Sequence, residues 1–392
     1  MRTPTIAIVC NALDDATRLQ RNIVTDSPAA SRKVFMLCQA LRKAGVRAYV
    51  LSLGRGRPSG SAYFKRTVKR INGVPVLYAP FSQTPVLSQV ISLFGLIPSL
   101  LRLSRAPSRS VVFYNRMTAY LPTLLVARLA GFRCLLDLED GEVISQTARY
   151  HSLRSRVRAS LNAVFDFLCR DGALLACSAL NEATRIRPSI CYYGTTTMLG
   201  ESTRWQQNAI TVLMSGILDE DTGAHILLEA IQLLRQDGGI ARPLSFEITG
   251  KGASLSDFER LAKESGSVTV KVHGRVSNVE YQQILDRSDI GMALKPVGGA
   301  LANTTFPSKV IEFADAGLLV LTTDISDVRK VLGEGAVYLD RNDPAQLAHL
   351  LRTIAADPTH VQQLARQGRQ TVLEQCAPGQ AGRSMATFIQ GS

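Results

Sequence analysis

Short apolar runs alternate with longer amphipathic segments along the whole sequence. In the first half, apolar runs with the length of buried strands lie at 5–10, 47–53, 75–78, 111–114, 134–138, 173–177 and 190–193. Between the first two runs, the segment SRKVFMLCQALRKAG has Ser27 or Asp26 available as a helix cap, Pro28 in its first turn and Gly45 after its end. This alternation predicts a parallel sheet covered by helices.

The same alternation starts again after a polar stretch at 200–209. It predicts strands at 210–214, 245–249, 269–273, 290–294, 319–322 and 336–339, and helices at 225–235, 255–264, 279–286 and 307–316. The sequence therefore indicates an α/β fold with two doubly wound, Rossmann-like domains, each binding ligands at the carboxyl ends of its strands. We expect domains at 1–205 and 206–375, and a tail at 376–392 able to cross back to the first domain.

Positive charge is concentrated in the first half. Residues 1–206 contain 28 Lys and Arg against 11 Asp and Glu, whereas 207–392 contain 17 against 21. The basic residues form two clusters: Arg55, Arg57, Lys65, Arg66, Lys69 and Arg70, then Arg102, Arg105 and Arg109. Few aromatic residues accompany them, which argues against a nucleic-acid partner. An anionic membrane surface or a phosphorylated substrate explains the charge better, and a solvated basic face without a partner stays open.

An apolar segment at 85–103 lies between these clusters. It has almost the length of a membrane-spanning helix, but Pro98 and several polar residues interrupt it. Two interpretations stay open: a helix at a membrane interface, or an ordinary helix packed on the sheet. The seven cysteines form no CxxC pair, and the first apolar run is too short for a signal peptide. We therefore expect a cytoplasmic protein, peripheral on the inner face of the cell membrane.

The segment 303–323 carries the strongest chemical signal. Pro307 suits the first turn of a helix, Gly317 suits the position after its end, and an apolar strand follows. The N-terminus of a helix at the carboxyl edge of a parallel sheet attracts phosphate. Lys309 could meet a diphosphate there, and Glu312, three residues later on the same side, could accept hydrogen bonds from a ribose. A simple surface ion pair between the two is the alternative.

Four motifs make the sequence similar to the retaining glycosyltransferases of family 4. They are MSGILDEDTGAHILLEAI, FEITGKGASL, VHGRVSNVEYQQILDRSDIGMAL and FPSKVIEFADAGLLVLTT, the last typical of a subgroup with FPSK. The resemblance implies the GT-B fold, two Rossmann-like domains facing each other across a cleft. It also implies a catalytic role for Lys309 and Glu312 at a nucleotide-sugar donor, with Glu312 on the ribose. The implied donor-binding residues are Gly216, Gly250, Lys251, Gly274, Arg275, Val276, Asn303, Thr304, Thr305, Phe306, Pro307, Ser308, Lys309 and Glu312.

The sequence departs from this family at three positions. Thr304 stands where members carry a first glutamate, and Ile217 and Thr222 stand where many carry Arg and Lys near the diphosphate. Lys309 and Lys251 could supply the missing positive charge.

Acidic residues follow the predicted strand 134–138. Asp137, Glu139, Asp140 and Glu142 would repel one another unless they face cationic or hydroxyl ligands. We expect Glu139 and Asp140 to contact sugar hydroxyls at the reacting centre, the alternative being that Asp137 or Asp140 caps the following helix.

Two further signals are weaker. Asp219–Asp221 form a DxD sequence, but their place after a strand does not favour a metal site, and His273 is expected as a strand-end residue. We therefore expect no metal and no cofactor.

Together these observations indicate a retaining hexosyl- or related glycosyltransferase of class EC 2.4. It would move a sugar from a nucleotide-sugar to a carbohydrate or lipid-linked acceptor, in surface polysaccharide or glycolipid biosynthesis. A nucleotide-sugar epimerase and a non-catalytic GT-B binding protein remain the alternatives.

Overall fold

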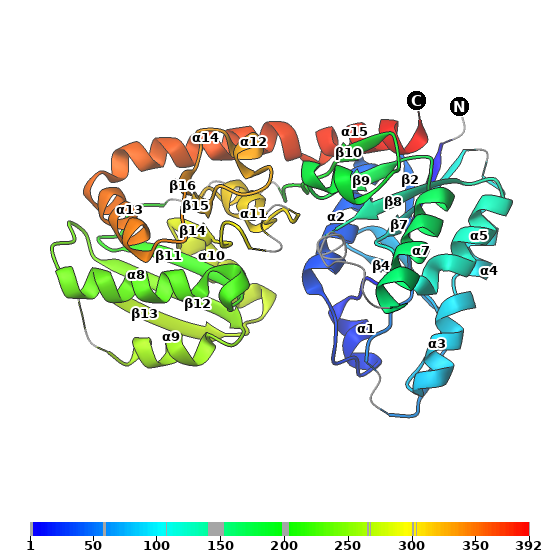
Figure 1. Ribbon diagram of the computed structural model, residues 1–392, viewed down its shortest axis with the longest axis horizontal. Helices are drawn as coiled ribbons and strands as arrows, with labels where there is room; N and C mark the ends of the chain where they lie inside the picture. The colour runs from blue at the N-terminus through cyan, green and yellow to red at the C-terminus, as the bar shows by residue number, and fades with distance from the viewer. Residues whose placement is uncertain are drawn as a thin grey trace. The chain divides into compact units, whose positions relative to one another are not determined.

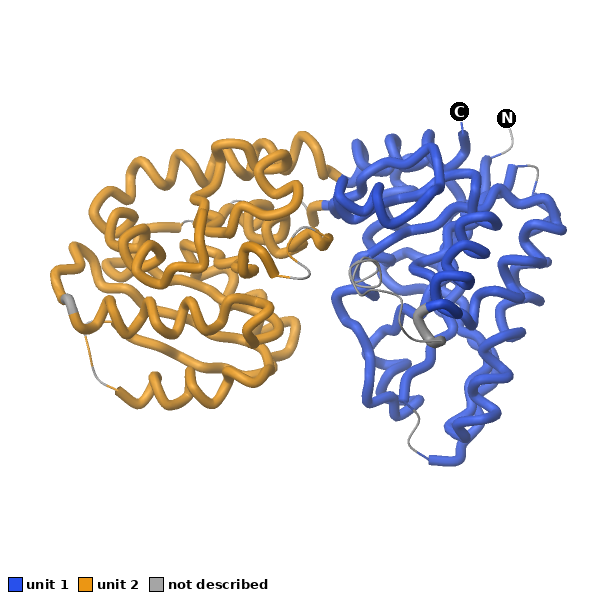
Figure 2. The backbone as a smooth tube through the Cα atoms, in the orientation of Figure 1, with its two compact units in different colours: residues 1–195, 378–392 blue, residues 196–377 orange. Residues whose placement is uncertain are grey.

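The computed structural model describes residues 3–57, 60–106, 108–139, 153–197, 204–264, 266, 268–299, 302 and 304–391. The chain forms two compact units, shown in different colours in Figure 2. Unit 1 comprises Met1–Thr195 and Pro378–Ser392, and unit 2 comprises Thr196–Ala377.

Unit 1 is built on a sheet with the strand order β10-β9-β8-β7-β1-β2-β5-β4. Its strands pair in parallel, except that β4 is antiparallel to β5. β1 lies in the interior of the sheet and is buried along its whole length. The strands are β1 (Thr5–Cys10), β2 (Arg47–Ser52), β4 (Thr67–Ile71), β5 (Val74–Tyr78), β7 (Arg109–Tyr114), β8 (Arg133–Leu138), β9 (Ala173–Leu175) and β10 (Ser189–Cys191); β3 (Tyr63–Phe64) and β6 (Phe81–Ser82) form a separate pair.

The helices of unit 1 lie around this sheet (Figure 1). They are α1 (Asp15–Gln20), α2 (Pro28–Lys43), α3 (Pro85–Phe94), α4 (Ile97–Leu103), α5 (Leu121–Leu129), α7 (Leu153–Leu168) and α15 (Pro378–Gln390). The C-terminal α15 packs against α2, so closely that a Cβ on Gly382 would lie 2.1 Å from the Ala40 carbonyl oxygen. The Ile389 carbonyl also accepts hydrogen bonds from Ser110 and Arg133. These contacts attach the end of the chain to unit 1.

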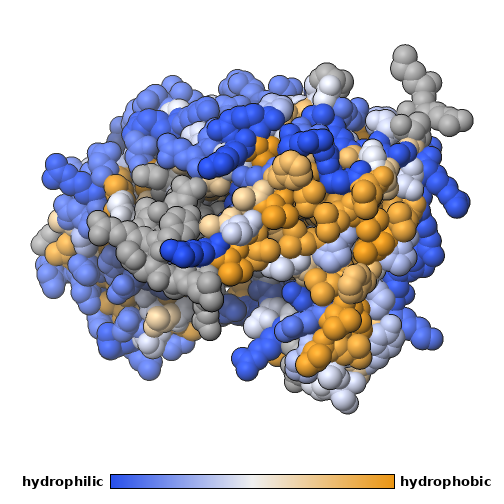
Figure 3. Space-filling model, turned by 45° about the vertical axis from the view of Figure 1, so that its right-hand side comes forward, coloured by the Kyte–Doolittle hydropathy of each residue, from blue (hydrophilic) through white to orange (hydrophobic). Residues whose placement is uncertain are grey.

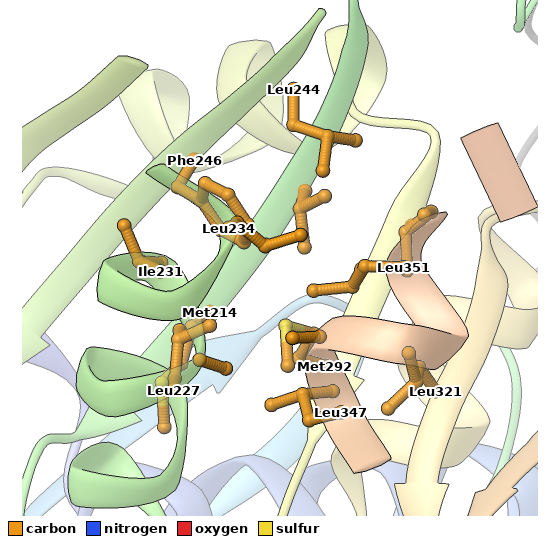
Figure 4. Packing of buried hydrophobic residues seen from close by; sticks show 14 of the residues in the cluster. Met214, Leu227, Ile231, Leu234, Leu244, Phe246, Met292, Leu321, Leu347 and Leu351 are labelled. Atoms are coloured by element: carbon orange, nitrogen blue, oxygen red, sulfur yellow. The ribbon is translucent and has the colours of Figure 1, made fainter. Parts of the chain in front are cut away.

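Unit 2 contains a parallel sheet with the order β13-β12-β11-β14-β15-β16. Its strands are β11 (Ile210–Ile217), β12 (Leu244–Lys251), β13 (Val268–Gly274), β14 (Ile290–Ala293), β15 (Leu319–Thr323) and β16 (Val337–Leu339). Its helices are α8 (Ala224–Asp237), α9 (Leu255–Ala262), α10 (Asn278–Arg287), α11 (Lys309–Asp315), α12 (Val328–Leu332), α13 (Pro344–Ala356) and α14 (Pro358–Cys376). Figure 4 shows how side chains of α8 and α13, including Leu227 and Leu347, meet Met214 and Met292 of the sheet.

The boundary between the two units lies upstream of residue 205, where the sequence predicted it. Arg204 donates hydrogen bonds to the carbonyls of Ala316 and Leu285, and the Trp205 amide donates to Asp289 at 2.7 Å. The Thr197 amide and hydroxyl donate to Asp315 at 2.6 and 2.7 Å. These bonds hold the connecting segment on unit 2, so that unit begins at Thr196.

The apolar segment 85–103 folds as two helices, α3 and α4, of 10 and 7 residues. Among the described residues it is the one stretch whose length and composition would allow it to cross a membrane, with a mean hydropathy of 1.7 and 28% of its residues buried.

Candidate functional site

Three neighbouring strand ends of unit 2 bring together several of the residues expected at the donor. In the register of the sheet, Gly216 pairs with Gly250, Ile217 with Lys251, and Thr249 with Gly274. A Cβ on Gly250 would lie 1.8 Å from the Gly216 carbonyl oxygen, so glycine is required there by the approach of the two strands. The glycines of TGKG therefore have a structural role independent of any ligand.

Helix α11 packs on the sheet through its apolar side. Val310, Ile311, Phe313 and Ala314 are buried, and a Cβ on Gly291 of β14 would meet the Phe313 ring at 2.3 Å. The helix begins at Lys309, two residues after the expected start at Pro307. With the core side fixed in this way, Lys309 and Glu312 lie together on the partly exposed side, as their spacing predicts.

Lys309 is the centre of a polar chain across three elements. Its Nζ lies 2.7 Å from Glu312 Oε2 and donates a 2.8 Å hydrogen bond to the Tyr281 hydroxyl, which lies 3.3 Å from Ser215 Oγ. The ammonium also lies 4.5 Å from the centre of the Tyr281 ring, within the range of a cation–π contact. The chain links α11 through α10 to the carboxyl end of β11.

The charged and polar groups of this polar chain stabilise one another. Burial alone would lower the pKa of Lys309, but attraction to Glu312 and Tyr281 and hydrogen bonds to both raise it above its ordinary value. Burial and the nearby Glu312 raise the pKa of Tyr281. At neutral pH the site therefore holds an ammonium, a carboxylate and a protonated phenol. The ion pair between Lys309 and Glu312, which the sequence offered as an alternative, is present. The Lys309 side chain is 32% exposed and the Glu312 side chain 11%.

A second lysine lies beside the segment that precedes α11. Lys295 Nζ donates to Thr305 Oγ1, and the Lys295 amide donates to Thr323 Oγ1 at 3.0 Å. Thr304 Oγ1 is buried and has no hydrogen-bond partner within the described part of the chain. Thus an unpartnered hydroxyl stands where the resemblance places a first glutamate, and the half-buried Lys295 contacts the residue next to it.

The other expected donor residues differ in exposure. Lys251, Arg275 and Ser308 are exposed, Gly216 and Ile217 are also exposed, and Phe306 and Pro307 are buried. Val276 is partly buried, and Asn303 lies outside the described residues. Ile217 exposes 58% of its side-chain surface at the end of β11.

The DxD sequence has a local structural role. Asp219 caps the short 3₁₀ helix Glu220–Thr222, accepting a hydrogen bond from the Thr222 amide while Thr222 Oγ1 accepts from the Asp219 amide. Within the described residues, no group of three or more His, Cys, Asp or Glu side chains could hold a metal ion.

His273 contacts a buried carboxylate near the end of β13. Its ring is paired with Glu247, which is 2% exposed and also accepts a 2.8 Å hydrogen bond from Arg287. The strand-end interpretation of His273 therefore agrees with the structure.

The acidic residues of unit 1 meet a lysine of the same chain. Lys33 Nζ lies 3.1 Å from Asp137 Oδ1 and also pairs with Glu139. The ammonium lies 5.4 Å from the centre of the Tyr192 ring, and Asp137 is 1% exposed, with its Oδ2 unpartnered in the described structure. Asp140 and Glu142 lie outside the described residues. Lys33 of α2 therefore supplies part of the positive charge that these acidic residues require.

The sequence interpretation missed Tyr281, Ser215, Lys295 and Lys33 as members of these clusters. Lys295 and Ser215 follow or end apolar strand runs, a position that could have marked them as candidates. Tyr281 and Lys33 lie within amphipathic helices, where the sequence pattern does not distinguish them from other half-buried side chains.

Comparison with known proteins bears on unit 2 most directly. Residues 199–371 match the family model described as Glycosyl transferases group 1. This segment, less than half of the chain, is similar to the glycosyl transferases group 1 family. No curated protein matches the sequence.

Solved structures match over nearly the whole chain. Anabaena Alr3699/HepE in complex with UDP-glucose has a TM-score of 0.64 at 13% identity, covering 99% of this chain and 100% of its own. Sucrose-phosphate synthase from Thermosynechococcus elongatus has a TM-score of 0.66 at 13% identity, covering 99% and 98%. The α,α-trehalose 6-phosphate synthase from Burkholderia multivorans has a TM-score of 0.61 at 10% identity, covering 100% and 99%. The predicted GT-B fold is confirmed.

Proposed function

We propose that this protein is a retaining glycosyltransferase that moves a sugar from a nucleotide-sugar to a saccharide or lipid-linked acceptor. The observation that carries the proposal is the polar chain from Ser215 through Tyr281 to Lys309 and Glu312, within the segment similar to the glycosyl transferases group 1 family. It joins an ammonium and a carboxylate at the edge of a parallel sheet where α/β folds bind nucleotides.

Each part of the site has a chemical task in this proposal. The Glu312 carboxylate accepts hydrogen bonds from the ribose diol, and Lys309 neutralises the diphosphate, with Lys295 as a second cation nearby. The unpartnered Thr304 hydroxyl supplies a hydrogen bond to the sugar in place of the usual glutamate. As the bond from the anomeric carbon to the diphosphate breaks, charge builds up on the diphosphate, where a fixed ammonium stabilises it most.

Retention follows from the family resemblance. The acceptor oxygen forms its bond to the anomeric carbon on the face that the diphosphate leaves, and the acceptor's proton passes to a diphosphate oxygen. Glu139 of unit 1, paired with Lys33, and Asp140 are the groups we assign to acceptor hydroxyls.

The donor is best sought first among uridine diphosphate sugars, because a structure of similar fold was solved with UDP-glucose. We assign the reaction to surface polysaccharide or glycolipid assembly on the cytoplasmic face of the membrane. The uneven charge and the apolar helices of unit 1 support this assignment.

The test measures release of free nucleoside diphosphate from a panel of nucleotide-sugars, with and without a lipid extract. Release that depends on the extract, together with a radiolabelled sugar in the lipid fraction, supports transfer. Binding of a nucleotide-sugar without release identifies a non-catalytic binding protein instead. Conversion of the sugar on an intact nucleotide identifies an epimerase.

A further inference from the structure

Helix α3 is amphipathic in the reverse sense to an ordinary surface helix. It buries Ser88 and Ser92, which are 6% and 4% exposed, and turns Val86, Leu87, Val90 and Phe94 outward, with 75% of Val86 and 55% of Phe94 exposed. A helix that packs on a protein by hydrophobic burial instead buries its apolar residues and exposes its serines. The orientation of α3 therefore requires another explanation.

The buried serines hold an arginine. Ser92 Oγ accepts a 2.8 Å hydrogen bond from Arg55 Nη1 and donates at 2.5 Å to the Ser88 carbonyl. The backbone of Arg55 is fixed as well, because its amide donates to Asn11 Oδ1 at 2.9 Å and its carbonyl accepts from Asn11 Nδ2 at 2.7 Å. Burial lowers the pKa of this guanidinium, and no carboxylate in the described structure forms an ion pair with it.

Arg55 lines a cavity of about 340 Å³ at one end of α3. Its polar lining comes from Asn11, Thr25, Arg55, Arg57, Ser88 and Gln89. The lining residues include two arginines and no acidic residue, so the cavity is complementary in charge to an oxyanion such as phosphate.

The floor of the cavity is tightly built. A Cβ on Gly56 would lie 2.2 Å from the Ile23 side chain, and the Arg57 amide donates to Thr25 Oγ1 at 2.8 Å. These contacts fix the backbone between the two arginines. The backbone of Arg57 and both the backbone and the guanidinium of Arg55 are therefore held in place before any ligand binds.

The outward apolar residues of α3 continue onto neighbouring helices. α5 packs against α3, α4 and α7, and further exposed apolar side chains are Leu101 on α4, Leu125 and Leu129 on α5, and Phe167 on α7. Figure 3 shows an apolar area on this side of unit 1. Arg102 and Arg105, both exposed, lie at the end of α4 and just after it. An apolar face bordered by arginines matches the interface of an anionic bilayer.

We propose that unit 1 binds phosphate-bearing lipids of an anionic membrane, with the lipid phosphate in the Arg55–Arg57 cavity and the apolar side of α3 against the hydrocarbon. One helix serves both parts, because Pro85, Ser88 and Gln89 line the cavity while Val86, Leu87, Val90 and Phe94 face outward. This binding goes beyond sugar transfer and does not depend on it.

Sedimentation of the full chain with vesicles tests the cavity. The protein should sediment with phosphatidylglycerol–phosphatidylcholine vesicles and remain in solution with phosphatidylcholine alone. The double variant Arg55→Gln/Arg57→Gln should bind the anionic vesicles about 25-fold more weakly, because each basic group near such a surface contributes roughly a fivefold change. The matched control is Lys263→Gln/Lys330→Gln, which removes two exposed lysines of unit 2. Equal binding by the two double variants would overturn the cavity assignment.

A second set of variants tests the apolar side of α3. Val86→Ser/Val90→Ser/Phe94→Ser changes only exposed side chains and should reduce vesicle binding at least 10-fold without lowering the melting temperature. The control Val279→Ser alters an exposed apolar residue of α10, 69% exposed, and should bind as the unchanged protein does. Normal vesicle binding by the triple variant would remove α3 from the interface. If the Arg55 substitution prevents folding, the variant Arg57→Gln alone tests the cavity in place of the double variant.

Calorimetry with inorganic phosphate distinguishes a lipid from a soluble ligand. Phosphate binding that is lost in the arginine variant, without any vesicle binding, would assign the cavity to a soluble phosphate compound and overturn the lipid proposal. UDP affinity should be unchanged in all of these variants, since the proposed donor residues lie in unit 2. Loss of vesicle binding and loss of donor binding can therefore be told apart.

Discussion

The Lys309 ammonium lies 2.7 Å from the Glu312 carboxylate, within one turn of α11, and the same ammonium donates to the Tyr281 hydroxyl. A cation in the first turn of a helix opposes the helix dipole, so the pair and the phenol supply the compensation that Lys309 needs without a ligand. When a nucleotide enters, in the function proposed above, the two charges can act on different parts of it.

Glu312→Gln should weaken the binding of free UDP by about 5- to 150-fold. The amide retains the size of the side chain but loses the charge that strengthens hydrogen bonds to the ribose, a loss of about 1 to 3 kcal/mol. Isothermal titration calorimetry measures the affinity, with Glu229→Gln, an exposed residue of α8, as the matched control. Unchanged UDP affinity in a folded Glu312 variant would remove this residue from the donor site.

Lys309→Ala should lower kcat by about 100-fold and change KM for the nucleotide-sugar much less. The ammonium stabilises charge that appears on the diphosphate as the bond breaks, and removing one such electrostatic donor typically costs 10²–10³ in kcat. Steady-state kinetics per folded molecule provide the measurement. A variant with a lower melting temperature and normal kcat would show that the ion pair only stabilises the helix.

Tyr281→Phe should reduce kcat about fivefold while leaving the fold intact. The ring and its cation–π contact remain, but the hydroxyl that bridges Ser215 and Lys309 is lost, and a hydrogen bond of this kind contributes about 1 kcal/mol. Kinetics compared with those of Tyr338→Phe, a tyrosine that donates to Gly333 elsewhere in unit 2, would check the effect. Equal kcat values for the two variants would contradict a positioning role for Tyr281.

The sequence predicted the strand framework of both units and the common side of Lys309 and Glu312. These features depend on apolar runs and on helical spacing, which are local. The edge strand β4 was missed because its residues are half-buried or exposed, so the sequence TVKRI carries no apolar run. The partner of Asp137 could not be predicted, because Lys33 is 104 positions away and reaches it only through the tertiary fold.

Lys33→Met should destabilise the protein by about 3 kcal/mol. Asp137 is almost completely buried, and removing one partner of a buried ion pair leaves an uncompensated charge, which costs about 3 to 5 kcal/mol. Urea unfolding followed by circular dichroism measures the change. Lys43→Met, at the exposed end of α2, should change the free energy of unfolding by less than about 0.5 kcal/mol. A similar small effect for both would mean that Asp137 and Glu139 do not rely on Lys33.

Glu247 should make the stability of the protein depend on pH on the acid side. Burial alone would raise the pKa of this carboxyl, but hydrogen bonds from Arg287 and His273 outweigh burial and hold it below its ordinary value of about 4.5. Because the pKa is lower in the folded state than in the unfolded state, the stabilisation is fully present above about pH 4.5 and is lost as the pH falls through the folded-state value. Glu247→Gln should therefore reduce the free energy of unfolding at pH 7, and the difference from the unchanged protein should shrink as the pH falls below about 4.5. The control Glu259→Gln, exposed on α9, should show no such convergence. A difference that stays constant across this range would mean that the charge of Glu247 does not contribute, and that the contacts with Arg287 and His273 act through packing alone.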